Sequence, residues 1–378
     1  MPVCPFRQSR QITLLDGSKR NILYPCGCCP VCSKNIQAQI FPRIRESMLG
    51  HRNTIFFTLT CTDDHIKYAL DKETGELLKY NDDMKPYLQL LLKRIDTRLR
   101  RKYPETFTNK HKGYEYYFCL EYGPNTQRPH LHGVINHNYH DDDFTDVFRE
   151  WKTKRGYTVV KSIKRSDPST FSKVAHYVSK YSSKGVLDSL YHHFRNKTIP
   201  APWRIYSSGF GKSYLTPKRL SWHRAEDINR RDFSNPYSYI CTRADTIYSR
   251  MRYFVDGYSF SMPLYYKDKV IQAPIRKLQK INIDGKIETR YVKHRSNTLS
   301  LLFELGLARH RIQVYLQQLR KVATEIQSGD FDKVIHQAIV DEERIIQENY
   351  KIICTKMNNY YFCKKYKQKK HYKTLEYE

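Results

Sequence analysis

The stretch YEYYFCLEYGPNTQRPHLHGVIN, residues 114–136, decides how this chain folds. Its first part, residues 114–121, is rich in aromatic side chains and predicts a strand. Residues 122–129 contain Gly-Pro-Asn and Arg-Pro, which are turn signals, and residues 131–136 predict a second, short strand. We therefore expect the two strands to pair as a hairpin.

Strands and helices alternate on both sides of this hairpin. Strands are predicted over residues 54–61, which are apolar and β-branched, and over residues 157–163. The polar residues 71–81 predict a loop or a hairpin. Apolar side chains at helical spacing predict helices over residues 86–101, 141–153 and 171–184. This order predicts an α+β fold with helices packed on one face of a mainly antiparallel sheet.

Composition divides the chain into three predicted parts. Residues 1–50 are rich in Cys and interrupted by Pro and Gly, which indicates an irregular module that a metal ion can stabilise. Residues 51–225 hold the alternating strands and helices. Residues 226–378 form a basic, Tyr-rich C-terminal region, and helical spacing over residues 299–327 and 331–350 predicts a mainly helical extension.

Charge and aromatic content indicate a polyanionic partner. The chain has 378 residues, and 66 Lys and Arg against 38 Asp and Glu give a formal net charge of +28. Nucleic acid is the most frequent partner of such proteins. The 31 Tyr and 17 Phe offer rings on which bases can stack, although Tyr is also common half-buried on sheets.

Neither a membrane-spanning segment nor a signal peptide is expected from the sequence. No apolar run approaches the length of about 18 residues that a membrane span needs. The first residues, MPVCPFRQSR, lack the apolar segment of a signal peptide. The ten Cys are therefore expected as thiols or metal ligands in a reducing cytoplasm rather than as disulfides.

His130 and His132 are the sharpest chemical feature. One residue separates them on a predicted strand, so both imidazoles point to the same face of the sheet. Taken alone, the pair fits either a metal site or two ordinary surface histidines. Glu121 ends the preceding strand, and the turn would bring its carboxylate beside both rings. These three ligands leave open positions on a divalent cation for a phosphate oxygen; Mg²⁺ or Mn²⁺ suits that role, and Zn²⁺ tolerates the same ligands.

Tyr177 and Tyr181 lie four residues apart on one face of a predicted helix, with Lys180 and Lys184 on a neighbouring stripe. A tyrosine hydroxyl becomes a nucleophile when a cation stabilises its oxyanion, so two hydroxyls beside two ammonium groups suggest covalent attack on phosphate. The alternative is an amphipathic helix whose Tyr side chains pack on the sheet while Lys faces solvent.

Together these elements resemble the HUH endonuclease superfamily, whose members nick single-stranded DNA to start rolling-circle replication. Residues 56–60 (FFTLT) are similar to the first motif of the family, His130-Leu131-His132 to its metal motif, and Tyr177 with Tyr181 to its two-tyrosine motif. The resemblance covers residues 51–225. It implies an HUH endonuclease-like antiparallel sheet and a catalytic Mg²⁺ or Mn²⁺.

The same resemblance implies a reaction. One Tyr would attack the scissile phosphate, giving a 5′-phosphotyrosine and a free 3′-OH. The other Tyr would attack the regenerated junction, so that circles are religated and released.

A narrower resemblance is to the replication initiators of microviruses, especially the gokushovirus branch, which are small bacterial viruses with circular single-stranded DNA. It rests on residues 121–124 (EYGP) leading into Arg128-Pro129-His130, and on the Cys-rich residues 25–32. The resemblance implies a viral protein that acts on single-stranded DNA and a replication origin in the host bacterial cytoplasm. A host helicase and DNA polymerase are implied as further partners, because no motor motif is visible.

The N-terminal cysteines form a second candidate metal site. Cys26, Cys29 and Cys32 match a C-x-x-C-x-x-C pattern with one extra Cys inside it, and Cys4 offers a fourth thiolate for a structural Zn²⁺. An iron–sulfur cluster also uses closely spaced thiolates, and the remaining alternative is a reduced loop without metal. Residues 207–213 (SSGFGKS) lack the spacing of a Walker A phosphate loop, so no ATP site is expected there.

Two other functions stay open from the residues. A non-enzymatic protein that binds or packages single-stranded nucleic acid would use the same charge, Tyr content and Cys module. Its binding would withstand EDTA, apart from any unfolding caused by loss of zinc. A transposase or plasmid relaxase would share the Glu-His-Tyr constellation, and the Cys segment favours the viral initiator over these enzymes.

Overall fold

The computed structural model of the chain describes residues 4–13, 18–27, 29–72, 75–108, 112–123, 126–163, 168–181, 193, 198–271, 277–283, 286–292 and 298–325. The chain forms two compact units. The first contains Met1–Leu215, Tyr253–Tyr266 and Lys280–Tyr291, and the second contains Thr216–Arg252, Lys267–Gln279 and Val292–Glu378. The three-part division at residues 50 and 225 stays a prediction.

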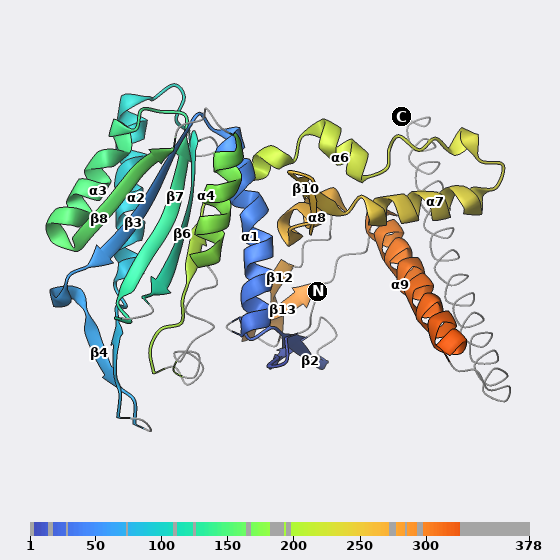
Figure 1. Ribbon diagram of the computed structural model, residues 1–378, viewed down its shortest axis with the longest axis horizontal. Helices are drawn as coiled ribbons and strands as arrows, with labels where there is room; N and C mark the ends of the chain where they lie inside the picture. The colour runs from blue at the N-terminus through green and yellow to red at the C-terminus, as the bar shows by residue number, and fades with distance from the viewer. Residues whose placement is uncertain are drawn as a thin grey trace. The chain divides into compact units, whose positions relative to one another are not determined.

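A five-stranded antiparallel sheet lies at the centre of the first unit (Figure 1). Its strand order is β8-β3-β7-β6-β9. The strands are β3 (Asn53–Cys61), β6 (Tyr114–Tyr122), β7 (Pro129–His137), β8 (Gly156–Ile163) and β9 (Arg204–Tyr206). The predicted hairpin is confirmed as β6 and β7, which supply two of the three inner strands. Sequence patterns did not indicate β9, which has only three residues.

One face of this sheet packs against α2 (Met84–Lys102) and α3 (Asp142–Lys154), as Figure 1 shows. Because side chains alternate along a strand, Phe57, Phe118 and Leu131 point to this side, where they are buried. The helices contribute the apolar stripes that their spacing predicted, among them Leu91, Leu99, Phe148 and Trp151. These contacts form the hydrophobic core that supports the opposite face.

The opposite face carries α1 (Pro30–Gly50) and α4 (Pro168–Tyr181), which also contact each other. Nδ2 of Asn136 on β7 donates a hydrogen bond to Oγ of Ser47 on α1, 2.8 Å away. The expectation of helices on one face only was therefore wrong, and so was the expectation that the first 50 residues are irregular. The buried side of α1 includes polar side chains such as Arg43 and Glu46, so the helix lacks an apolar stripe that a sequence pattern could reveal.

Helix α1 begins directly after the Cys segment. The side chain of Cys29 accepts a hydrogen bond from the backbone N–H of Cys32, and Pro30 stands at the start of the helix. Two hairpins flank these elements along the chain: β1 (Gln8–Thr13) pairs with β2 (Lys19–Tyr24), and β4 (Lys67–Leu70) pairs with β5 (Leu77–Tyr80). The second lies where a loop or hairpin was predicted.

The second unit contains α6 (Pro217–His223), α7 (Pro236–Ser249) and α9 (Thr298–Glu325). Helices α7 and α9 approach closely, because a Cβ at Gly306 would lie 2.3 Å from the carbonyl oxygen of Ala244. Helix α9 matches the helix predicted over residues 299–327. The helix predicted over 331–350 and the basic tail lie outside the described residues.

The other elements are β10 (Arg252–Val255), β11 (Tyr258–Ser261), α8 (Leu264–Val270), β12 (Lys277–Ile283) and β13 (Lys286–Val292). The α+β class, the antiparallel sheet covered by helices and the N-terminal Cys cluster are confirmed. Within the described ranges, no helix is both long and apolar enough to cross a bilayer.

Candidate active site

Three neighbouring strands bring the predicted metal ligands into two adjacent rows. In one row, Thr60 of β3 pairs with His130 of β7, which pairs with Glu121 of β6. In the next row, Thr58 pairs with His132. Directly paired residues of antiparallel strands point to the same face, so these side chains lie together on the side that carries α1 and α4.

Threonine hydroxyls from β3 hold both imidazoles. Oγ1 of Thr58 lies 3.0 Å from Nδ1 of His132, and Oγ1 of Thr60 lies 2.9 Å from Nδ1 of His130. With Nδ1 engaged, Nε2 is the nitrogen of each ring that can ligate a cation. Sequence analysis placed these threonines in the first motif but gave their side chains no separate role, although their spacing on one strand repeats the spacing of the histidines on the next.

Glu121 faces His132. Oε2 of the carboxylate lies 2.9 Å from Nε2 of the imidazole, and both side chains are buried. A buried carboxylate requires a positive or hydrogen-bonding partner, which the ring or a cation can supply. Two of the three predicted ligands are therefore in direct contact.

His130 is directed toward the turn that precedes β7. A Cβ built on Gly123 would lie 3.1 Å from Nε2 of His130, so the glycine leaves space beside the ring. Burial lowers the pKa of His130, which favours the neutral imidazole that binds metals. Two imidazoles, a carboxylate and a space that a Cβ would fill suit a divalent cation.

In the observed side-chain conformations, the ligand atoms of His130, His132 and Glu121 do not converge on one point. The ring centroids of His130 and His132 are 6.3 Å apart. Among the described residues, only the four N-terminal cysteines form a group of three or more ligands whose atoms all lie within 4.8 Å of one another. Coordination by His130, His132 and Glu121 together would require a side-chain rotation.

Helix α4 places both tyrosines over the histidine rows. The ring of Tyr181 stacks on the imidazole of His132 with a centroid distance of 3.9 Å, and Tyr177 meets Tyr181 edge-on at 4.7 Å. Tyr177 also contacts Phe56 of β3 and is 47% exposed. Burial, and then a hydrogen bond donated to Tyr177 and the charge of Glu121, raise the pKa of Tyr181. Its hydroxyl is therefore protonated at neutral pH in the absence of a cation.

The core-facing side of α4 is built by Phe171, Ala175 and Val178, all buried, rather than by the two tyrosines. Lys180 is exposed on this helix. Lys184, the second predicted lysine, lies outside the described residues. The structure thus brings together Glu121, His132, Tyr177 and Tyr181, with His130 alongside.

The N-terminal thiols form a compact cluster. Sγ of Cys4 lies 3.5 Å from Sγ of Cys26 and 3.7 Å from Sγ of Cys29, and the Cys26 and Cys32 sulfurs are 3.8 Å apart. Four thiolates around a zinc ion at 2.3 Å are about 3.8 Å from one another, because that is the edge of such a tetrahedron. The cluster can therefore hold a metal ion.

Backbone groups support this cluster. The N–H groups of Cys29 and Cys32 donate to the sulfurs of Cys26 and Cys29, at 3.3 and 3.4 Å. Burial raises the pKa of the Cys32 thiol to about 12 and also raises that of Cys29. Thiolates in this position need a compensating positive charge, which a metal ion provides.

Comparisons with known proteins relate the chain to replication-associated proteins. Residues 54–186 match the model of the replication-associated protein ORF2/G2P family. The chain is 26% identical over 212 residues to the replication-associated protein VP4 of Bdellovibrio phage phiMH2K, covering 51% of this chain and 61% of that protein. The chain thus spans about three fifths of that curated relative, and no solved structure matches it. The resemblance to a phage replication protein that the motifs indicated is therefore confirmed as a similarity to phage replication-associated proteins, and residues 54–186 are the part that matches the family model.

Proposed function

We propose that this chain is a metal-dependent nicking and joining endonuclease that initiates rolling-circle replication of a single-stranded DNA genome. The observation that carries the proposal is the stacking of Tyr181 on His132, whose imidazole contacts Glu121 at 2.9 Å. A hydroxyl nucleophile, an imidazole and a carboxylate then lie within one set of contacts. That combination suits transfer of a phosphoryl group to tyrosine.

The reaction is a transesterification. The hydroxyl oxygen of Tyr177 or Tyr181 attacks the scissile phosphorus, the bond to the 3′ oxygen breaks, and the tyrosine proton passes to the leaving 3′ oxygen, which becomes the 3′-OH. A Mg²⁺ or Mn²⁺ held by His130, His132 and Glu121 would polarise the phosphate and stabilise the phenolate. The second tyrosine can attack the regenerated junction, so the phosphodiester energy is conserved and no ATP site is required.

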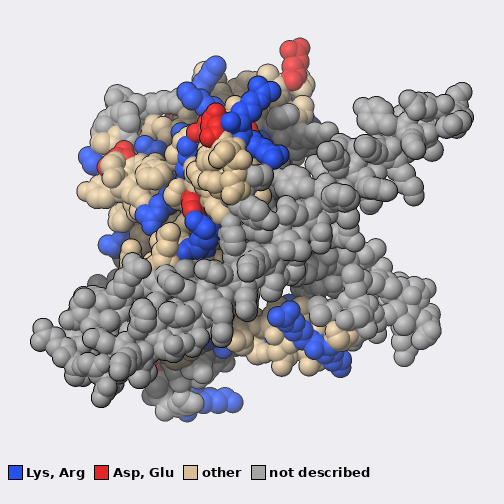
Figure 2. Space-filling view, turned by 90° about the vertical axis from the view of Figure 1, so that its right-hand side faces the viewer, with Lys and Arg blue, Asp and Glu red and all other residues tan. Residues whose placement is uncertain are grey.

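The surface charge supports a DNA partner. On the part of the molecule described in Figure 2, Lys and Arg patches are more extensive than Asp and Glu patches. Helix α2 carries a basic stripe along an open groove of about 720 Å³, with Lys93, Arg94, Arg98, Arg101 and Lys102 in its lining. Glu150 and Asp143 pair with Arg94 and Lys102 and reduce the charge only in part. Such a surface binds phosphates without reading sequence.

The proposed reaction implies DNA and host-protein partners and a cellular location. The DNA is the single-stranded replication origin of a bacterial virus, and the reaction occurs in the host cytoplasm. A host helicase would separate the strands and a host DNA polymerase would extend the 3′-OH. We assign the cluster of Cys4, Cys26, Cys29 and Cys32 to a structural Zn²⁺, because the sulfur spacings suit a zinc tetrahedron.

The test is a covalent-adduct assay with the purified full chain. Single-stranded viral origin oligonucleotides labelled at the 5′ or the 3′ end are incubated with Mn²⁺ and resolved on a denaturing gel. A protein-linked product that retains the 3′ label supports tyrosine attack with 5′-phosphotyrosine polarity. Absence of any covalent product, together with tight binding that withstands EDTA, would replace this function with that of a binding or packaging protein.

A further inference from the structure

An exposed tyrosine continues the catalytic row onto the edge of the sheet. Tyr157 of β8 pairs directly with Thr60 of β3, which pairs with His130. All three side chains therefore point to the same face. Because β8 is an edge strand, no further strand among the described residues covers this end of the row, and Tyr157 is 67% exposed. Adjacent strands lie about 4.8 Å apart, so Tyr157 is two strand spacings, about 10 Å, from His130.

A pocket of about 320 Å³ opens between the ring of Tyr157 and the end of β3. It is lined by Thr60, Thr62, Asp63, Arg128 and Tyr157. Its volume is at the lower end of the range typical of small-ligand sites. The pocket thus shares Thr60 with the histidine rows and lies next to them.

The lining combines a flat aromatic ring with both a donor and an acceptor. The guanidinium of Arg128 donates to the carbonyl oxygen of Cys61 at 2.8 Å and pairs with the carboxylate of Asp63. The Asp63 side chain is 73% exposed. A carboxylate repels phosphate, whereas it accepts hydrogen bonds from the amino group of a base. This chemistry favours a nucleobase over a phosphate group.

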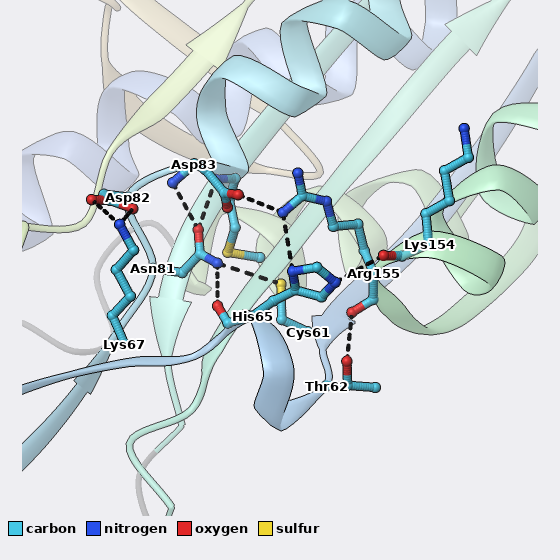
Figure 3. A network of polar contacts seen from close by, with 10 residues as sticks. Cys61, Thr62, His65, Lys67, Asn81, Asp82, Asp83, Lys154 and Arg155 are labelled. Atoms are coloured by element: carbon cyan, nitrogen blue, oxygen red, sulfur yellow. Dashed lines mark hydrogen bonds and ion pairs between the residues drawn. The ribbon is translucent and has the colours of Figure 1, made fainter.

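Hydrogen bonds hold the residues at the floor of the pocket in place. The backbone N–H of Thr62 donates to the carbonyl oxygen of Arg155 at 2.9 Å, and its hydroxyl donates to the same oxygen at 3.3 Å. Arg155 in turn pairs with Asp83, as Figure 3 shows. Asn81 donates to the carbonyl oxygen of His65. These contacts tie the end of β3 to the residue just before β8, so the pocket exists before any ligand arrives.

We propose that this pocket holds one unpaired nucleobase of the DNA strand, stacked on Tyr157 and hydrogen-bonded through an exocyclic amino group to Asp63. The inference rests on the proposed function, because the proposed nicking reaction requires the DNA strand to cross the histidine rows. Base stacking on an aromatic side chain contributes about 1–3 kcal/mol, which corresponds to about 5- to 150-fold in affinity. Cytosine, adenine and guanine carry the amino group, and thymine does not.

The experiment measures binding by fluorescence anisotropy in the full chain carrying Tyr177→Phe and Tyr181→Phe, so that no strand is cut. The probes are a dC homopolymer, a dT homopolymer and an abasic strand, each of about 20 nucleotides. This length exceeds the 4 to 16 nucleotides that a single-strand-binding fold typically covers. We expect Tyr157→Ala to weaken dC binding by about 5- to 150-fold and to leave abasic binding unchanged. Equal losses for both probes, or no loss for dC, would overturn the inference.

Matched variants separate stacking from other effects. Tyr157→Phe keeps the ring and should bind dC as tightly as the parent. Tyr258→Ala removes an exposed tyrosine of β11, 71% exposed, and should also leave dC affinity unchanged. The asparagine side chain in Asp63→Asn offers both a hydrogen-bond donor and an acceptor, so it can pair with thymine as well as cytosine. The ratio of dC affinity to dT affinity should therefore decrease. An unchanged preference in this variant would remove Asp63 from the base contact.

The adduct assay and the binding assay together distinguish a failure of the base pocket from a failure of the proposed nuclease function. An adduct with origin DNA, combined with Tyr157→Ala binding that equals the parent, would refute the base pocket alone. The reverse outcome, a Tyr157-dependent dC affinity without any adduct, would refute the nuclease and leave a base-binding surface. Unchanged thermal unfolding of Tyr157→Ala is expected, because its side chain is exposed.

Discussion

The imidazole of His132 and the ring of Tyr181 stack face to face, with centroids 3.9 Å apart and planes 15° from parallel. This contact joins β7 to the C-terminal end of α4, so the position of the helix determines where the phenol lies. Glu121 contacts the same imidazole at 2.9 Å. The sheet and the helix therefore meet at one residue that touches both the proposed nucleophile and a proposed ligand.

The double variant Tyr177→Phe, Tyr181→Phe should lose the covalent adduct and keep its fold. Phe preserves the ring contacts with His132 and Phe56, so the free energy of unfolding should change by about 1 kcal/mol or less. The adduct is measured with labelled single-stranded origin DNA and Mn²⁺, and stability by urea denaturation. A protein–DNA adduct that persists in the double variant would exclude both hydroxyls as the nucleophile.

Thr60→Val should weaken Mn²⁺ binding by about 10- to 100-fold, because the hydroxyl that lies 2.9 Å from Nδ1 of His130 no longer orients the ring. Isothermal titration calorimetry measures the affinity. Thr60→Ser restores a hydroxyl and should recover most of it. If Thr60→Val binds Mn²⁺ like the parent while Thr60→Ser offers no advantage, the threonine does not position a metal ligand.

Cys29→Ser should reduce bound zinc to background and lower the melting temperature. Cys29 is fully buried, so the loss of the metal removes a cross-link from the start of α1, whereas the serine hydroxyl can still cap the helix. Zinc content is measured by mass spectrometry after gel filtration. Cys241→Ser, in the second unit, is the matched control and should retain zinc. Equal zinc content in the two variants would contradict the assignment.

The sequence patterns predicted the elements whose periodicity is simple. The β6–β7 hairpin, α2 and α3 each bury an apolar side, and each was predicted within a few residues of its bounds. Helix α1 was missed because Arg43, Glu46 and Ser47 are buried on it, so burial does not follow hydrophobicity there. Strand β9 is too short to leave a periodic signal.

The site was predictable in its residue types more than in its arrangement. Spacing placed His130 and His132 on one face, and both do share it. The roles of Thr58 and Thr60 depend on which strand lies beside β7, and that order comes from chain topology. The exposure of Tyr157 likewise depends on β8 being an edge strand. Local patterns carry neither piece of information.

Gly156→Ala should destabilise the first unit by more than about 2 kcal/mol. Its φ is +149°, and a Cβ would lie 2.3 Å from the carbonyl oxygen of Thr60. Gly75→Ala is the matched control: its φ is also positive, at +71°, but nothing lies within 4 Å of its Cβ position. Urea denaturation should show the larger loss for Gly156→Ala. Equal losses would mean that backbone conformation alone, and not the close approach of β3, accounts for the effect.

Stability should fall on acidification because of His137. Its side chain is fully buried with Nε2 3.1 Å from Oδ1 of Asp141, and burial lowers its pKa from 6.5 to about 4. Between these values the unfolded chain binds the proton and the folded chain does not, so stability is complete above pH 6.5 and declines toward pH 4. The slope from this group approaches about 1.4 kcal/mol per pH unit.

Urea denaturation at several pH values between 4 and 7 measures that slope. His137→Gln removes one titrating ring and should reduce the slope, while the share of His223, whose pKa burial also lowers to about 4, remains. His140→Gln, at an exposed position in the same segment, is the control for the exchange of a histidine for glutamine. If His137→Gln keeps the full slope of the parent, another buried group must take up the proton, and the acid sensitivity does not arise at this histidine.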